Sequence, residues 1–530
     1  MFSVLRNHTG SILMRFILAA FLFLSNVAFC QSSDPSAAMG IESITGTDLR
    51  KHLFILASDS MAGRETSMPG QQKAARYIAG EFQRLGLKPV GDSNSFFQRY
   101  DVEVSRINYV SSFLTINGAT TPWGNGYLST SLKETTITAP VAFVGYTDNK
   151  LDPAMKQKIA GHIIVSILGP RNRAADTTSE GFMGKLFATR RDSGSFVLMT
   201  ITEDTGRASF DAIATTLGSF GMDKGQMRLK GAAGGGFQQQ LLRVYLSPTR
   251  AEELLKGSGM TVATLRAKAL ADSAFTPVFL KNAAVTIANS VIRETRVAEN
   301  VVGFLEGSDP VFKDQVVVYT AHFDHLGSNA SGVIFYGADD DGSGTSTVLE
   351  IAEAYAANPV KPKRSVLFMT VSGEEKGLLG SSYYVQHPIL PLDKTAANLN
   401  TDMVGRIGYS YQKKSDENYV YVIGSDKISK ELDSLLTSSN AETVNLHLDY
   451  TYNDENDPNR FYFRSDHYNF AKNGIPVVFF FTGEHQDYHK PSDTPDKILY
   501  DRMARIGRLI YYTGWKVAQL DHPLAKNPAK

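Results

Sequence analysis

Three consecutive aspartates, Asp339, Asp340 and Asp341, stand between glycines in residues 337–344. Carboxylates this close together repel one another unless cations hold them. The glycines permit a tight backbone path, and a helix that begins after Gly344 would offer N–H groups to anionic partners. The run therefore suggests a metal site, although a turn followed by a helix N-cap explains it equally well when it is considered alone.

Other side chains that can bind metals follow predicted strands. In chain order they are His322 with Asp324, Glu374 with Glu375, Asp402, and His489. In open α/β sheets, ligands bind outside the carboxyl ends of the strands. Four strand ends that all carry acidic or imidazole groups predict one shared centre of nitrogen and oxygen ligands.

Two pairs of these residues suggest how the chemistry is divided. His322 and Asp324 are two residues apart and face the same way on an extended segment. A metal-bound histidine commonly donates its other ring N–H to a carboxylate, so Asp324 is expected in that supporting position. Of Glu374 and Glu375, one can bind metal while the other takes a proton from the attacking water, as hydrolysis requires. A solvated acidic turn is the alternative for this pair.

Composition limits the class of protein. A chain of 530 residues exceeds the size at which one core keeps growing, so two domains are expected. The 54 Lys and Arg residues balance 54 Asp and Glu residues, which removes any general electrostatic argument for nucleic acid or an anionic membrane surface.

The N-terminus is predicted to be a secretory signal peptide, residues 1–30, because Arg15 precedes a short apolar run. A lipoprotein signal is less favoured, since Phe29 stands where a small residue is required. Cys30 is the only cysteine, so the mature chain is expected to bind metals through His, Asp and Glu alone. No other stretch is apolar and long enough to predict a membrane helix.

The order of the predicted elements indicates an α/β fold. Helices are expected after Gly344 and over 502–520. Strands are expected at 315–320, 365–370, 397–400, 419–423 and 475–481. This alternation favours a mixed, mostly parallel sheet flanked by helices.

Residues 119–281 have a different character, with short strands, a glycine loop at 231–236 and few helices. We interpret them as an inserted β-rich domain. The main domain is then discontinuous and comprises 41–118 and 282–522. An elaborated part of a single domain is the alternative.

Six motifs together resemble the M28 family of co-catalytic zinc peptidases. They are His322-x-Asp324, the loop 337–344, Ser372-Gly373-Glu374-Glu375-x-Gly377, Asn400-Thr401-Asp402-Met403-Val404-Gly405, Ser465-Asp466-His467, and Tyr488-His489-x-Pro491-Ser492-Asp493-Thr494. The resemblance runs from about residue 41 to 520 and implies the zinc-dependent exopeptidase fold, which is phosphorylase/hydrolase-like. The inserted segment more loosely resembles a protease-associated (PA) domain.

The resemblance also implies two Zn²⁺ ions per chain. It places His322 and Asp402 on one zinc, Glu375 and His489 on the other, and Asp340 as the bridge between them. It further implies a cis peptide bond after Asp340. Carried over in the same way, Glu374 is the general base and Tyr488 stabilises the tetrahedral intermediate. Burial is expected to raise the pKa of Glu374 above that of an exposed glutamate.

These roles imply a metallo-aminopeptidase, a hydrolase that is periplasmic or extracellular and acts on peptide substrates. A carboxypeptidase or dipeptidase stays open, because Arg406 or Arg464 could hold a terminal carboxylate, whereas Glu455 or Asp457 could hold a free amine. A catalytically inactive, receptor-like binding protein is the alternative from another class, and glutaminyl cyclisation is a further one. The sequence leaves the oligomeric state open.

Overall fold

The computed structural model describes residues 34–147, 153–168, 197–206, 208–219, 224–232, 242–271 and 275–528. The chain forms two compact units, Met1–Tyr100 with Ala298–Lys530, and Asp101–Val297. The predicted signal peptide, residues 1–30, lies outside the described residues. The range 119–281 falls inside the second unit, and its identity as a PA domain stays a prediction.

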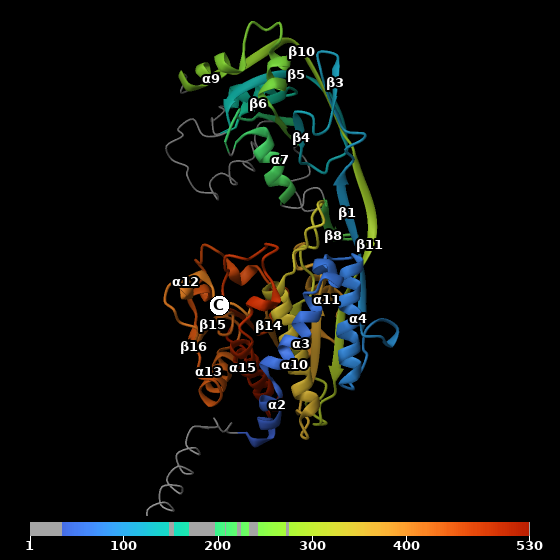
Figure 1. Ribbon diagram of the computed structural model, residues 1–530, viewed down its shortest axis with the longest axis vertical. Helices are drawn as coiled ribbons and strands as arrows, with labels where there is room; N and C mark the ends of the chain where they lie inside the picture. The colour runs from blue at the N-terminus through green and yellow to red at the C-terminus, as the bar shows by residue number, and fades with distance from the viewer. Residues whose placement is uncertain are drawn as a thin grey trace, which may run out of the picture. The chain divides into compact units, whose positions relative to one another are not determined.

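The first unit is built on one mixed sheet (Figure 1). Its strands are β1 (Phe97–Ile107), β11 (Val291–Leu305), β12 (Val316–His322), β13 (Ser365–Val371), β14 (Thr395–Thr401), β15 (Tyr419–Ile423), β16 (His447–Asp449) and β17 (Val477–Phe481). They are ordered β16-β15-β17-β14-β12-β13-β11-β1. The central strands β13, β12, β14 and β17 are parallel, while β11 and β15 pair antiparallel with β13 and β17. The predicted mixed, mostly parallel α/β sheet is confirmed.

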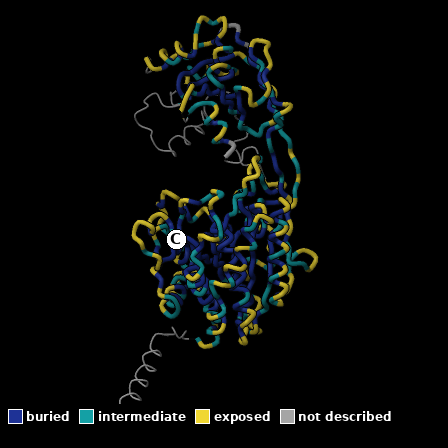
Figure 2. Tube along the Cα trace, viewed as in Figure 1, coloured by how far each residue is buried: buried dark blue, intermediate teal, exposed yellow. Residues whose placement is uncertain are grey.

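Both faces of this sheet are buried, and strand β12 illustrates why its sequence is a continuous apolar run. Every residue of β12 is buried. Val317, Tyr319 and Ala321 enter one hydrophobic core, whereas Val316 and Val318 enter another. Successive side chains point to opposite faces, so a strand covered on both sides needs apolar residues along its whole length. Figure 2 shows this buried interior.

Helices cover both faces. They are α2 (Ala38–Ser43), α3 (Gly46–Leu56), α4 (Pro69–Arg84), α10 (Gly344–Ala357), α11 (Leu379–Gln386), α12 (Tyr409–Gln412), α13 (Lys430–Glu442), α14 (His467–Ala471) and α15 (Tyr500–Gln519). Helices α10 and α15 pack on β12 and β14, and α2, α3 and α4 pack on α10. Helix α14 contacts β14 and β17, and α11 packs on α14.

The second unit has its own sheet, ordered β3-β2-β10-β5-β6-β7-β9-β4. Its strands are β2 (Phe113–Ile116), β3 (Ala119–Pro122), β4 (Tyr127–Ser129), β5 (Thr135–Tyr146), β6 (Ile163–Ile167), β7 (Val197–Ile201), β9 (Leu242–Leu246) and β10 (Val278–Asn289), and β8 (Gln226–Leu229) pairs with β1. The sequence predicted few helices here. The described residues nonetheless include α5 (Pro153–Ile159), α7 (Phe210–Ser219), α8 (Pro248–Leu255) and α9 (Val262–Ala271).

The parallel register of the first unit aligns the carboxyl ends of its central strands. His322 at the end of β12 pairs with Val371 at the end of β13, and Thr401 of β14 pairs with Phe480 of β17. The loops that leave these strands therefore start from one edge of the sheet, where ligands bind in folds of this type. Among the helices in the described part of the chain, none is long and apolar enough to cross a membrane.

Candidate metal centre

The loops at this edge bring the predicted ligands together. His322 is the last residue of β12, the two glutamates follow β13, Asp402 directly follows β14, and His489 lies in the loop after β17. Asp340 comes from a short helical segment, η5 (Ala338–Ser343), which leads into α10. Segments that are more than one hundred residues apart in the chain thus supply a single site.

One group of donor atoms surrounds His322. Its Nε2 lies 3.2 Å from Asp340 Oδ1 and 3.5 Å from Asp402 Oδ1. Asp402 is oriented by Ser465, whose hydroxyl donates to Asp402 Oδ2 at 2.7 Å. A tetrahedral ion with ligands at about 2.1 Å would separate neighbouring donors by about 3.4 Å, so these three side chains fit around one zinc-sized ion.

A second group surrounds His489. Its Nε2 lies 3.0 Å from Asp340 Oδ2 and 3.3 Å from Glu375 Oε2. The other oxygen of Glu375 lies 2.8 Å from Nδ1 of His325, a buried histidine to which the sequence assigned no definite role. These separations again suit donors that share one small cation.

Asp340 belongs to both groups, because each of its carboxylate oxygens faces a different histidine. Its side chain is buried, and its peptide bond to Asp341 is cis, as the resemblance implies. Burial opposes ionisation of Asp340, but the hydrogen bonds from His322 and His489 outweigh burial and hold its pKa well below the usual range. An ionised carboxylate in this position can bridge two cations.

The neighbouring aspartates point elsewhere and tie loops together. Asp341 accepts hydrogen bonds from the main-chain N–H groups of His322, Gly344 and Met403 at 2.8 to 3.1 Å. Asp339 accepts from the N–H of Gly405 at 2.6 Å. The first and third aspartates of the run, Asp339 and Asp341, thus fix the segments that carry the ligands.

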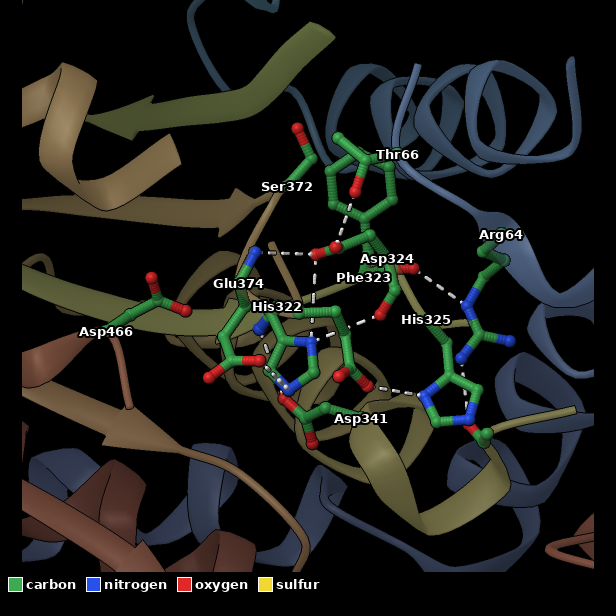
Figure 3. A network of polar contacts seen from close by, with 12 residues as sticks. Arg64, Thr66, His322, Phe323, Asp324, His325, Asp341, Ser372, Glu374 and Asp466 are labelled. Carbon is green, nitrogen blue, oxygen red and sulfur yellow. Dashed lines mark hydrogen bonds and ion pairs between the residues drawn. The ribbon is translucent and has the colours of Figure 1, made fainter. Parts of the chain in front are cut away.

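Glu374 lies at the edge of the first group, within reach of His322 and Asp402. Its Oε2 is 3.9 Å from His322 Nε2, farther than either aspartate oxygen. Its main-chain N–H donates to Asp324 Oδ1 at 3.2 Å (Figure 3). Burial raises the pKa of Glu374 well above the usual range, and Glu375 and Asp402 raise it further against the opposing effect of His322. The direction of this shift agrees with the expectation from the sequence.

Asp324 supports the site through different contacts from those expected. The nearest partner of His322 Nδ1 is the main-chain carbonyl of Asp324, at 3.1 Å, whereas the Asp324 carboxylate lies 3.8 Å away. That carboxylate accepts from Thr66 at 2.7 Å and from the N–H of Glu374. Asp324 therefore orients the segment that carries Glu374 as well as the histidine.

A cavity of about 440 Å³ opens onto these groups, a volume within the range of small-ligand sites. Tyr488 lines it, and its ring stacks on that of His489 with 3.9 Å between centroids. Burial and the nearby Asp340 and Glu375 raise the pKa of Tyr488, so its hydroxyl stays protonated and can donate.

The rest of the cavity wall is mostly apolar, with Leu378, Met403, Phe461, Phe463, Phe479 and Phe481. Arg464 and Glu484 also line it and form an ion pair at 2.8 Å. Three other residues considered for substrate termini, Arg406, Glu455 and Asp457, are not part of this wall. Arg406 is buried and pairs instead with Asp487 at 3.0 Å.

The sequence comparison identifies the family. The profile of peptidase family M28 matches residues 300–514, the range that holds every predicted metal ligand. Residues 300–514 of the chain thus match peptidase family M28. The family predicted from the six motifs is therefore confirmed.

Relatives of this chain include proteins named as peptidases. The aminopeptidase YwaD of Bacillus subtilis is 29% identical over 220 residues, which are 40% of this chain and 43% of that protein. A probable zinc metalloprotease of Pyrenophora teres f. teres is 28% identical over 266 residues, which are 42% of this chain and 51% of that protein. The chain thus spans about half the length of these relatives.

The fold is also that of solved aminopeptidase structures. An aminopeptidase from Aneurinibacillus sp. strain AM-1 superposes with a TM-score of 0.55 at 18% identity, over 93% of this chain and 98% of that one. A zinc aminopeptidase from Bacillus subtilis gives a TM-score of 0.51 at 18% identity, over 91% and 99%. At this identity, the likeness concerns the fold alone.

Some residues at the site have sequence features from which their position there was not predicted. Phe479 and Phe481 line the cavity while Phe480 enters the main core, which is the alternation of a strand with two unlike faces. Glu484 stands close in sequence to the predicted ligand His489. Arg64 and Thr66 lie more than 250 residues before the first ligand, and nothing in the sequence near them indicates this location.

Removing the shared carboxylate tests the metal centre. Asp340→Ala is expected to lose bound zinc, because both groups of donors lose a ligand. Elemental analysis of the purified variant would measure this, with Asp454→Ala in an exposed loop as the control. Zinc at the wild-type level in Asp340→Ala would contradict the bridging position.

Buried His467 predicts an effect of pH on stability. Burial lowers its pKa to about 3 from an ordinary 6.5, so the unfolded chain binds more protons between these values. Stability conferred by neutral His467 is complete above pH 6.5 and falls as the pH drops towards 3. Urea unfolding should show that the free energy of unfolding falls less between pH 7 and pH 5 for His467→Phe than for the wild type. Equal losses would exclude this contribution.

Proposed function

We propose that this protein is a dizinc aminopeptidase that removes N-terminal residues from peptides. The observation that carries the proposal is the position of the Asp340 carboxylate, whose two oxygens face separate groups of imidazole and carboxylate donors. Nitrogen and oxygen donors of this kind suit zinc. The two relatives named above, an aminopeptidase and a probable zinc metalloprotease, support the same function.

Five residues would hold the two ions: His322 and Asp402 on one, Glu375 and His489 on the other, and Asp340 on both. When bound, a zinc pair supplies Lewis acidity that polarises the peptide carbonyl and makes water a better nucleophile. Ser465 holds Asp402 in place, and Asp341 holds the main chain of His322.

Glu374 is the residue that moves protons. It faces the cavity, and its Oε2 lies farther from His322 Nε2 than the Asp340 and Asp402 oxygens do, so its carboxylate would stay available as a base when those two hold the ion. It takes a proton from the attacking water and gives it to the departing amine. Tyr488, with its protonated hydroxyl at the cavity wall, donates a hydrogen bond to the carbonyl oxygen as negative charge develops there.

The charges at the cavity wall favour an amine over a carboxylate at the substrate terminus. Arg464 is paired with Glu484, and Arg406 is buried against Asp487 outside the wall, so neither guanidinium is free for a terminal carboxylate. This distinction supports an aminopeptidase over a carboxypeptidase, and the complete donor set with Glu374 disfavours an inactive receptor.

The apolar wall indicates which N-terminal residues fit. Phenylalanine rings from β17 and from the segment around Phe461 surround the space beside the donor groups. Burial of a large apolar side chain there contributes on the order of 2 kcal/mol to binding. We therefore propose a preference for leucine or phenylalanine at the substrate N-terminus.

We also propose that the protein is exported from the cell through the predicted signal peptide.

Replacing the base separates metal binding from proton transfer. Glu374→Gln is expected to abolish turnover while zinc content stays near the wild-type value, because the side chain is not a ligand. Kinetic assays and elemental analysis of the same preparation would establish both points. Retained turnover would exclude Glu374 as the base.

Substrate blocking separates the candidate activities. Leucyl and phenylalanyl p-nitroanilides with a free amine should be cleaved, and their N-acetyl forms should not. A chelator should abolish cleavage, and added Zn²⁺ should restore it. Release of C-terminal residues from N-blocked peptides would instead identify a carboxypeptidase, and no cleavage by the zinc-loaded protein would favour a binding protein.

A further inference from the structure

We propose that Arg64 is a positioning residue of the metal centre, which sets the distance between the segment carrying His322 and the segment carrying Asp340. The inference builds on the proposed dizinc site. It concerns a residue that binds no metal and lies in the turn η2 (Asp59–Arg64), far from the ligands in sequence.

The side chain of Arg64 is fully buried, and its described hydrogen bonds all go to main-chain carbonyls (Figure 3). Nε donates to Phe323 at 2.7 Å, one terminal nitrogen donates to Leu56 and Tyr336 at 2.8 Å each, and the other donates to Gly337 at 2.8 Å. One planar group thus joins three segments of the chain. A guanidinium carries several N–H donors in a fixed fork, which an ammonium group does not.

Two of these segments carry metal ligands. Phe323 directly follows His322, and Gly337 begins the glycine-rich run that contains Asp340. The distance between His322 Nε2 and Asp340 Oδ1 is 3.2 Å, and it depends on how these segments are held. Because Arg64 bonds to the main chain of both, it constrains their separation directly.

The turn that carries Arg64 is anchored to the same region. His325 donates its main-chain N–H to the carbonyl of Arg64 at 3.2 Å, and Gly327 donates to Gly63 at 2.9 Å. Gly63 has φ of +70°, and a Cβ there would lie 2.4 Å from the carbonyl oxygens of Gly327 and Phe335. The backbone at Gly63 therefore lies too close to Gly327 and Phe335 for any residue but glycine. These contacts fix the main chain next to Arg64.

Charge gives Arg64 a second effect on the site. Burial lowers the pKa of the guanidinium, while Asp324, Asp340, Asp341 and Asp493 raise it. None of these carboxylates accepts one of its described hydrogen bonds. A buried positive charge among several buried carboxylates reduces their mutual repulsion, so it stabilises the arrangement that receives the cations.

Arg364 provides a matched control. It is also fully buried, and it donates to the carbonyls of Val517 at 3.2 Å and Leu520 at 2.6 Å and to that of His522. Its Nε donates to the side-chain oxygen of Gln315 at 2.8 Å. Arg364 directly precedes β13, whereas Glu374 follows the opposite end of that strand, about 20 Å away. Arg364 therefore also joins main-chain carbonyls through a buried guanidinium, but none of them belongs to a segment that carries a ligand.

The experiment compares Arg64→Lys with Arg364→Lys in the full chain. Zn²⁺ binding to the metal-free proteins is measured by calorimetry, and thermal unfolding is measured with and without Zn²⁺. Loss of a group that orients metal ligands typically weakens metal binding about 10- to 100-fold, and this is expected for Arg64→Lys. Arg364→Lys should lower the melting temperature and leave zinc affinity at the wild-type value.

Two results would overturn the proposal: wild-type zinc affinity in Arg64→Lys, or equal weakening in both variants. If Arg64→Lys fails to fold, Arg64→Gly, which suits φ of +51°, is refolded with ethylguanidinium or ethylammonium. Recovery of zinc affinity with ethylguanidinium alone supports the proposal, and no recovery overturns it. Zinc binding is measured without substrate, so a wild type that binds two zinc ions but cleaves no peptide counts only against the aminopeptidase proposal.

Discussion

The mutual repulsion of buried carboxylates is the constraint on which the site depends. Asp340, Glu374, Glu375 and Asp402 converge at one edge of a sheet, where the dielectric is low and like charges interact strongly. Such a group persists only if each carboxylate has a positive partner or a hydrogen bond. His322 and His489 partner the shared carboxylate of Asp340, and the separations between donors leave room for two cations.

Three kinds of support hold this arrangement. Parallel strands of matched register end together, so their loops start from one place. Asp341 accepts hydrogen bonds from main-chain N–H groups, and Asp339 accepts one from the N–H of Gly405. The two outer aspartates of the run are therefore structural. Arg64 then joins two of these loops by donating hydrogen bonds to their main-chain carbonyls. In the proposed mechanism, Glu374 is held near the metal ligands by Asp324 and acts as the base.

The sequence predicted the main sheet and the convergence of the ligands because both depend on local patterns. Continuous apolar runs identify strands buried on both faces, and acidic or imidazole residues just beyond them mark one sheet edge. It predicted few helices in residues 119–281, where the structure has α5, α7, α8 and α9. It also could not find Arg64, because a single arginine in a turn has no periodicity, and only the tertiary structure brings it to Phe323 and Gly337.

Anomalous X-ray diffraction at the zinc edge, from crystals of the zinc-loaded protein, tests most directly whether Asp340 bridges two metals. Two peaks are expected, one contacted by His322 and Asp402, the other by Glu375 and His489, with one oxygen of Asp340 on each. A single peak, or two peaks of which only one contacts Asp340, would contradict the dizinc centre.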